Sequence, residues 1–239
     1  MNEVIKVKGL TKFYNKIPVV NNLNLSVKKG TAFGLLGDNG AGKSTTIECI
    51  LGTKKADSGN ISVLNLNPVT DRKKLYHKAA VQFQETGYQD QITVKEVCEV
   101  TASCYRKAAE PIELLKIFGI AEKQKSLVKN LSGGERQRLS VVLALIPNPE
   151  IVFLDELTTG LDVKARRDVW NILLRLKREG LTIFLTSHFM EEVELLCDSI
   201  CILKSGKPVF YGTVREATEN SPYNRFEDAY LWYIDEEGK

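Results

Sequence analysis

Residues 37–44 have the composition and spacing of a phosphate-binding loop. The segment reads GDNGAGKS, which fits the pattern G-x-x-x-x-G-K-[ST], and it follows an apolar run at residues 32–36. A glycine-rich turn exposes backbone N–H groups to an anion. Lys43 and Ser44 then open a helix-like stretch that we expect to end near Gly52. A phosphate group accounts for a lysine at the positive end of a helix, so the segment predicts a nucleotide phosphate site. The alternative is a fortuitous glycine-rich turn.

Two adjacent acids, Asp155 and Glu156, follow a second apolar run at residues 151–154. Ligands of open α/β sheets bind beyond the carboxyl ends of the strands, so we expect this pair beside the phosphates. One carboxylate can hold Mg²⁺ with the Ser44 hydroxyl, and the next can orient an attacking water. We assign Asp155 to the metal and Glu156 to the water. A phosphate-binding loop alone does not tell whether a protein is a kinase, a GTPase or a motor ATPase. The acid pair narrows the choice among these enzyme classes.

His188 is one of two histidines in the chain and follows an apolar run at residues 181–185. Its place after a core strand puts it beside the expected site, where it can hydrogen-bond a γ-phosphate. A lone histidine is more often a surface or packed residue. Ser187 and His188 are not a nucleophile and its base, because adjacent residues do not reach that geometry and no G-x-S-x-G segment exists.

A further segment with chemical meaning is LSGGE at residues 131–135. Ser132 and Glu135 form the S-x-x-E pattern of a capping box before an apolar helix, which is the simplest interpretation. Gly133 and Gly134 leave backbone N–H groups open to an anion at the start of that helix. A second anion site in a chain with one phosphate-binding loop needs an explanation.

Alternating strands and helices supply the frame for these residues. We expect strands at residues 4–7, 19–27, 32–36, 61–64, 151–154, 181–185, 199–203 and 208–211, and helices at residues 163–178 and 190–196. Strands that alternate with helices predict a parallel sheet, and the fully apolar run at 151–154 suits a strand buried on both faces. Residues 93–145 are mostly helical in pattern, with Pro111 at a helix start, and indicate an inserted helical subdomain.

Composition is that of an ordinary soluble protein of 239 residues, with 43% apolar residues and a net charge of +3. The longest apolar stretch, residues 141–146, falls far short of the ~20 residues that span a bilayer. The N-terminus lacks the pattern of a signal peptide, so we expect a cytoplasmic protein. The basic runs, such as residues 72–74, indicate solvated faces rather than a nucleic-acid surface. Five scattered cysteines fit reduced thiols and no metal site.

With these motifs in order, the sequence resembles the ATP-binding subunits of ABC transporters over nearly its whole length. The resemblance rests on the phosphate-binding loop, Gln84 in VQFQE, the LSGGE segment, the strand ending at Asp155 and Glu156, and His188. Leu161 and Asp162 resemble the family's D-loop. Tyr14 matches the aromatic residue that stacks on adenine, with Phe13 as the competing candidate.

The resemblance implies ATP and Mg²⁺ as cofactors and a role for each matching residue. Lys43 would bind the β- and γ-phosphates, Glu156 would activate water, and His188 would steady the γ-phosphate. Ser44, Gln84 and Asp155 would hold Mg²⁺. The residues implied to contact nucleotide are Tyr14, Asn39, Gly40, Ala41, Gly42, Lys43, Ser44, Thr45, Gln84, Asp155 and Asp162, with Ser132, Gly133 and Gly134 contacting the ATP of a partner subunit.

The resemblance also implies partners. Two ATP-binding subunits would sandwich two ATP molecules head to tail, as copies or as homologous chains, which accounts for the second anion site. Gln84 and the loop after it would touch a transmembrane permease subunit, so the chain would be peripheral at the cytoplasmic face of the membrane. ATP would close the dimer and hydrolysis would open it. No nucleic-acid partner is expected.

The implied fold is an α/β P-loop NTPase with a mixed sheet core, an N-terminal antiparallel β-subdomain and an inserted α-helical subdomain. We expect one ATP-binding domain at residues 1–220, with the helical subdomain at about 86–146, and a docked helical tail at 221–239. The segments at residues 158–162, 190–192 and 206–212 are more similar to drug and lipid exporters than to nutrient importers.

Departures from the family pattern remove no chemical group. Leu157 and Val163 stand where the family usually has proline, Asp38 replaces a frequent proline, and Glu135 stands where many importers have glutamine. We therefore expect hydrolysis, with Leu157 able to slow turnover. Two alternatives stay open: a soluble ABC ATPase that works on ribosomes or DNA, and a non-hydrolysing regulatory protein on the same fold.

Overall fold

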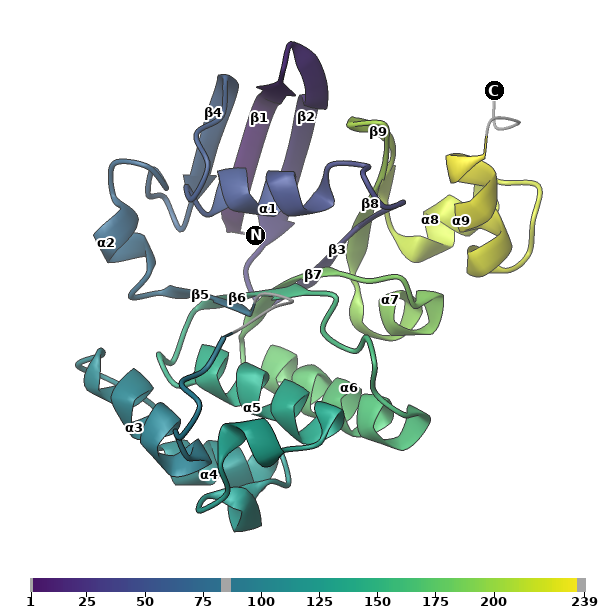
Figure 1. The fold of residues 1–239 in the computed structure, drawn as a ribbon. Helices are drawn as coiled ribbons and strands as arrows, with labels where there is room; N and C mark the ends of the chain where they lie inside the picture. The colour runs from purple at the N-terminus through teal and green to yellow at the C-terminus, as the bar shows by residue number, and fades with distance from the viewer. Residues whose placement is uncertain (1, 83–86, 236–239) are drawn as a thin grey trace.

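A six-stranded sheet runs through the middle of the computed structural model, which describes residues 2–82 and 87–235 (Figure 1). Its strands lie in the order β5-β6-β7-β3-β8-β9. The bounds are β5 (Ala79–Gln82), β6 (Ile151–Asp155), β7 (Thr182–Thr186), β3 (Ala32–Gly37), β8 (Ser199–Lys204) and β9 (Lys207–Gly212). Neighbours from β5 to β8 pair in parallel, and β9 pairs antiparallel with β8. Every residue of β3 and β7 is buried, because helices or a second sheet cover both faces.

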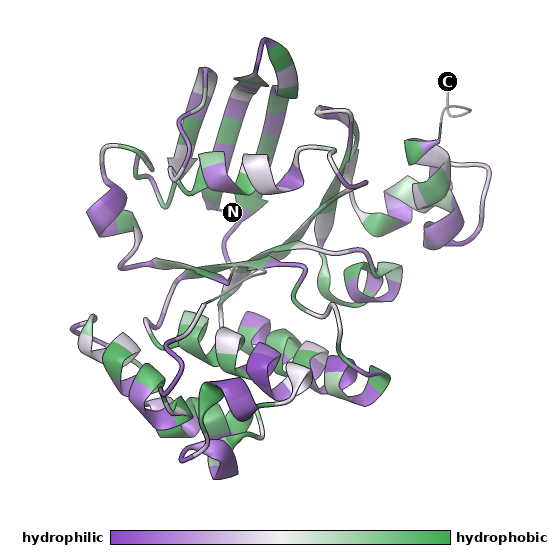
Figure 2. Ribbon diagram, in the orientation of Figure 1, coloured by the Kyte–Doolittle hydropathy of each residue, from purple (hydrophilic) through white to green (hydrophobic). Residues whose placement is uncertain are grey.

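A three-stranded antiparallel sheet and α1 cover one face of the central sheet. Its order is β2-β1-β4, with bounds β1 (Glu3–Tyr14), β2 (Ile17–Lys28) and β4 (Ser58–Val63). Figure 2 shows alternating apolar and polar bands along β1 and β2, as expected for strands with one buried face. Ile5 and Leu25 from this sheet share a core with Ile47 of α1 (Lys43–Ile50) and Phe33 of β3.

Helices cover the opposite face of the central sheet (Figure 1). They are α3 (Val94–Ser103), α4 (Pro111–Ile117), α5 (Gly133–Leu145) and α6 (Val163–Arg178), with short 3-10 turns η1 (Ala121–Lys123) and η2 (Val128–Asn130) between α4 and α5. Successive residues of β6 point to opposite cores. Val152 and Leu154 pack with the helices, whereas Ile151 and Phe153 pack with α1 and the smaller sheet.

The last segment of the described chain packs against β8 and β9 of the sheet. It comprises α8 (Val214–Glu219) and α9 (Phe226–Ile234), with α7 (Met190–Leu196) nearby; the remaining helix, α2 (Arg72–Leu75), precedes β5. Phe226 and Tyr230 of α9 share a core with Met190 of α7 and Ile202 of β8. Amphipathic burial therefore holds α9 against the body of the protein (Figure 1).

The predicted fold class is confirmed: a mixed sheet, an antiparallel N-terminal sheet and a helical layer inserted before β6. The predicted bounds of α6 and α7 agree with the structure. The expected strand at residues 61–64 lies at 58–63 instead, since Leu64 has a left-handed φ of 54°. β5, α2 and α8 were not predicted, although Thr213 and Glu216 form a capping box that signals α8. The proposed domain bounds stay predictions.

Candidate functional site

The loop between β3 and α1 curls around its own lysine. Lys43, at the first position of α1, is 6% exposed and donates hydrogen bonds to the carbonyls of Gly37 and Asp38 at 2.7 and 3.1 Å. Gly42 has a φ of 101°, and a Cβ there would lie 2.4 Å from the carbonyl oxygen of Val19 in β2. Glycine is therefore required for the loop to adopt this conformation and to approach β2. Ser44, the next residue of α1, is exposed.

The acid pair lies where β6 ends, beside the end of β7. Asp155 and Thr186 are paired in the register of these strands, and the Thr186 hydroxyl donates to Asp155 Oδ1 at 2.5 Å. Glu156 has a left-handed φ of 49°, and its N–H is held by the Thr186 hydroxyl at 3.0 Å. His188, two residues beyond β7, lies with Nε2 2.7 Å from Glu156 Oε1. Strand register thus brings together two of the residues that the sequence predicted for hydrolysis.

Electrostatics joins the lysine loop to the acid pair. Burial lowers the pKa of Lys43, and the carboxylates of Glu156, Asp155 and Asp38 oppose this shift. Burial also raises the pKa of Asp155, an effect opposed by the hydrogen bond from Thr186 and by the charge of Lys43. The ammonium and both carboxylates therefore act on one another across the sheet edge. One buried cation next to two acids is suited to a polyphosphate that also brings a metal cation.

The LSGGE segment forms the capping box that the sequence predicted at the start of α5. Ser132 Oγ accepts from Glu135 N at 3.2 Å, and Glu135 Oε2 accepts from Ser132 N at 2.9 Å. A Cβ on Gly134 would lie 3.5 Å from Leu161, next to Asp162, which caps α6 by accepting from Ala165 N at 2.8 Å. The structure therefore brings the LSGGE segment beside the turn of Asp162.

This second helix terminus lies on the other side of the central sheet from the lysine loop. In Figure 1, α1 lies above the six-stranded sheet and α5 below it. Ser132 and Gly133 are exposed, so this helix start is accessible from solvent. One copy of the chain therefore presents two separate regions suited to anions rather than one closed site.

Two further predicted contacts are Tyr14 and Gln84. Tyr14 is 40% exposed at the end of β1, with the ammonium groups of Lys12 and Lys54 at 5.7 and 5.4 Å from its ring centroid. Lys54 lies in the segment after α1, so these contacts join Tyr14 to that segment. Phe13, the competing candidate, is also exposed. Gln84 lies outside the described residues.

Sequence reasoning missed two polar residues, Thr186 and Glu192, whose hydrogen bonds support the site. Thr186 binds both Asp155 and Glu156, and Glu192 of α7 is 2% exposed and accepts from the indole N–H of Trp170 at 2.8 Å. A threonine at the carboxyl end of a buried strand, next to an expected histidine, was an available signal for Thr186. Glu192 carried no such signal, because an acid on a short amphipathic helix is normally solvated.

A metal at this site would take only part of its ligands from the protein. Within residues 2–82 and 87–235, no group of three or more His, Cys, Asp or Glu side chains is arranged to hold a metal. The Ser44 hydroxyl and the Asp155 carboxylate are hard oxygen donors, which suit Mg²⁺. Mg²⁺ in nucleotide sites is commonly bound by one or two protein groups plus substrate phosphates. The donors present therefore fit Mg²⁺ that arrives with a nucleotide.

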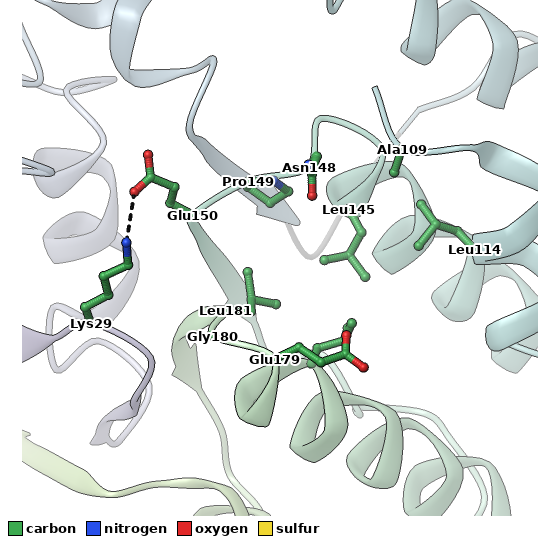
Figure 3. Close-up of a pocket in the computed structure, with 11 residues that line it drawn as sticks. Lys29, Ala109, Leu114, Leu145, Asn148, Pro149, Glu150, Glu179, Gly180 and Leu181 are labelled. Atoms are coloured by element: carbon green, nitrogen blue, oxygen red, sulfur yellow. Dashed lines mark ion pairs between the residues drawn. The ribbon is translucent and has the colours of Figure 1, made fainter. Parts of the chain in front are cut away.

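A cavity of about 470 Å³ lies elsewhere (Figure 3). Its wall includes Glu150, which precedes β6 and forms an ion pair with Lys29 at 3.7 Å, together with Leu145 and Leu181. Asp155 ends β6, so this cavity lies at the opposite edge of the sheet from the acid pair. It contains none of the predicted site residues.

Comparison with known proteins agrees with the geometry. A family model described as "ABC transporter" matches residues 20–159, more than half of the chain, and one described as "AAA domain, putative AbiEii toxin, Type IV TA system" matches residues 127–194. The chain is 41% identical over 214 residues to the Nod factor export ATP-binding protein I of Rhizobium meliloti (strain 1021), covering 87% of this chain and 64% of that protein. It thus spans slightly less than two thirds of that relative's length.

A second relative is the linearmycin resistance ATP-binding protein of Bacillus subtilis (strain 168), 35% identical over 218 residues, which cover 88% of this chain and 68% of that protein. Among solved structures, an ATP-binding subunit of an ABC transporter matches with a TM-score of 0.87 and 25% identity over 96% of this chain and 99% of that one. A dimeric, post-hydrolysis ATP-binding cassette bound to ADP and Pi matches with a TM-score of 0.78 and 26% identity, covering 87% of this chain and 98% of that one. The chain therefore belongs to the ABC transporter family, as an ATP-binding ABC ATPase domain.

Proposed function

We propose that this chain binds and hydrolyses ATP to power export across a membrane by a separate permease subunit. The observation that supports it most is the convergence of Lys43, Asp155, Glu156 and His188 at one edge of the sheet. Two of the relatives are named for Nod factor export and for linearmycin resistance. A drug, lipid or other amphipathic solute is the class of cargo that we propose. The bounds of the ATP-binding domain at 1–220, its helical part at 86–146 and the tail at 221–239 belong to the same proposal.

Nucleotide binding would divide among three parts of the chain. The backbone N–H groups of the loop, Asn39, Gly40, Ala41 and Gly42, would cradle the phosphates with Lys43, Ser44 and Thr45 at the start of α1. Tyr14 would stack on the adenine. Ser44, Gln84 and Asp155 would hold Mg²⁺, which when bound neutralises charge on the β- and γ-phosphate oxygens. The Thr186 hydroxyl fixes the orientation of Asp155 for that task.

Glu156 would act as the general base of hydrolysis. Its carboxylate would accept a proton from a water whose oxygen attacks the γ-phosphorus, while the bond between that phosphorus and the β–γ bridging oxygen breaks to release ADP. His188 lies 2.7 Å from Glu156 in this structure. From that position its ring can orient the carboxylate or donate to a γ-phosphate oxygen. A left-handed φ at Glu156 is a strained conformation of the kind that is retained at functional sites.

The complete site would need two chains. Ser132, Gly133 and Gly134 would contact the γ-phosphate of ATP bound to the partner subunit, with Asp162 beside them. Their location across the sheet from the lysine loop supports this arrangement (Figure 1). The partner is a second copy or a homologous chain.

A permease subunit would supply the membrane part. Among the described residues, no helix combines the length and the apolar character needed to cross a bilayer. We propose that the chain is peripheral at the cytoplasmic face of the membrane, in contact with the permease through the loop that follows Gln84. Co-purification of the permease with this chain from detergent extracts would identify the transporter.

Mixing two inactive variants tests the shared site. Lys43→Ala removes the phosphate lysine, and Gly133→Asp places a carboxylate where the partner's γ-phosphate would lie. Gly133 has open space around it and is the first residue of α5, where an acid is compatible with the helix dipole. Each variant alone should release no phosphate from Mg-ATP.

A 1:1 mixture should recover about a quarter of wild-type activity, because half of the dimers are mixed and each mixed dimer has one of two sites intact. A mixture as inactive as its components, with dimers present, would overturn the shared site. Absence of phosphate release by the wild-type chain would overturn hydrolysis itself.

A further inference from the structure

Helices α6 and α7 are joined by a cluster of charged and aromatic side chains that the proposed chemistry does not use. Arg166 and Trp170 lie one turn apart on α6, and Phe189 and Glu192 lie at the start of α7. The Arg166 guanidinium carbon is 3.8 Å from the centroid of the Phe189 ring. Trp170 donates its indole N–H to Glu192 at 2.8 Å. We call these four residues the α6–α7 clamp.

The residues on both sides of His188 are held by contacts at or beside the clamp. Phe189, the residue after His188, is stacked under Arg166. Ser187, the residue before it, is 2% exposed, and its hydroxyl accepts from Phe189 N–H at 3.0 Å. His188 is thus the tip of a short turn with both flanks held, which fixes the direction of its ring toward Glu156.

The same arginine also holds the turn that precedes α6. Its Nη2 donates to the carbonyl of Leu161 at 3.5 Å, and its backbone N–H donates to the carbonyl of Asp162 at 2.9 Å. Its Nε is buried without a hydrogen-bond partner in the described part of the chain. A buried guanidinium nitrogen that lacks its hydrogen bond costs stability unless its position serves another purpose. The charge of Glu192, which lies near it, offsets part of that cost.

We propose that Arg166 is a positioning residue that couples the Asp162 turn to His188 through its stack on Phe189. Arginine suits this task because its planar group stacks on a ring while its edges hydrogen-bond, which lysine does not reproduce. The coupling runs through direct contacts from the Leu161 carbonyl to the guanidinium and from the guanidinium to the Phe189 ring, and Phe189 is bonded to His188. Its consequence rests on the proposed function, in which the Asp162 turn lies at the partner subunit. Approach of the partner would then alter the pairing of His188 with Glu156.

The chain has two histidines, so ring-nitrogen NMR of ¹⁵N-histidine protein reports on His188 with His77 as an internal reference. Arg166→Gln should move the His188 ring signals by more than their linewidth, because the ring loses its fixed direction toward Glu156. Arg166→Lys should also move the His188 signals, because lysine does not reproduce the stack on Phe189. Phe189→Leu should move them in the same way. The matched control is Arg167→Gln, since Arg167 is the exposed neighbour on the same helix. Unchanged His188 signals in Arg166→Gln would overturn the proposal.

Kinetics separate positioning from a merely structural role. Arg166→Gln should lower kcat by about 10–100-fold, the usual effect of a small misplacement, and leave the KM for ATP unchanged. In a His188→Ala background the same substitution should cause no further fall, because Arg166 acts through that residue. An equal fall in both backgrounds would overturn the coupling. If the wild-type chain releases no phosphate, the proposed function fails, while the NMR result still decides the position of His188.

Discussion

Replacing Trp170 by phenylalanine should destabilise the protein through one buried hydrogen bond. Trp170 is 4% exposed, Glu192 is 2% exposed, and the indole N–H donates to Glu192 Oε1 at 2.8 Å. Loss of a bond to a buried carboxylate costs about 1.5–3 kcal/mol, so at a pH above the raised pKa of Glu192 we expect a loss of ~2 kcal/mol in the free energy of unfolding. At about 2–4 °C per kcal/mol for a domain of this size, Tm should fall by roughly 4–8 °C.

A double-mutant cycle isolates the hydrogen bond from the cavity that the smaller ring leaves. The cycle combines Trp170→Phe with Glu192→Gln, which keeps the shape of the acid but removes its charge. Trp170→Phe leaves the same cavity in the wild-type and in the Glu192→Gln background. The difference between its two costs in unfolding free energy therefore reports the interaction with the carboxylate. Chemical denaturation should show a smaller cost of Trp170→Phe in the Glu192→Gln background. Equal costs in the two backgrounds would refute the reasoning.

The pH dependence follows from the burial of Glu192. Burial raises the pKa of this carboxyl, while the Ser187 hydroxyl and the Trp170 indole offset part of that shift. The folded state therefore holds the proton more tightly than the unfolded chain, whose ordinary value is 4.5. The stability from this group is present below pH 4.5 and is lost as the pH rises through the raised folded value. The cost of Trp170→Phe should accordingly be larger at alkaline than at acidic pH.

Three further substitutions test the nucleotide site. Glu156→Gln should retain ATP binding and accumulate an ATP-bound dimer, because closure persists when attack by water is blocked; sedimentation that shows only monomer with Mg-ATP would count against it. Lys43→Ala should abolish tight nucleotide binding in calorimetry, and unchanged affinity would contradict the assigned role of the loop. Gly42→Ala should lower stability by about 1–3 kcal/mol, because a Cβ there would lie 2.4 Å from the Val19 carbonyl. Gly40→Ala is its control, since Gly40 also has a positive φ, 82°, but open space around it; an equal loss of Tm in both would exclude the contact as the cause.

Local patterns predicted the elements that carry the site. A strand, a glycine-rich turn and a helix follow one another within residues 32–50, and helices α6 and α7 were predicted with their correct bounds. Such features depend on side chains a few positions apart, whose effects on the backbone are local. Short elements escaped prediction, and β5, with the sequence AAVQ, is an example. Its two alanines give little strand signal, and its place in the sheet comes from pairing with β6.

Residues far apart in sequence gained their relations only from tertiary structure. The pairing of Asp155 with Thr186 depends on the register between β6 and β7, and that register also brings His188 within 2.7 Å of Glu156. The left-handed φ of Glu156 and the stack of Arg166 on Phe189 are likewise set by packing rather than by local preference.

The sequence by itself therefore determined which chemical groups this ABC ATPase domain carries and which strand or helix presents each of them. Motif spacing and hydrophobic periodicity are short-range properties, so a reading of neighbouring residues was sufficient. Only the tertiary structure decided which groups meet: Lys43 near both acids, Gly134 beside Leu161, and the LSGGE segment across the sheet from the lysine loop. Those relations arise from strand order and from burial shared among distant segments, which no local pattern encodes.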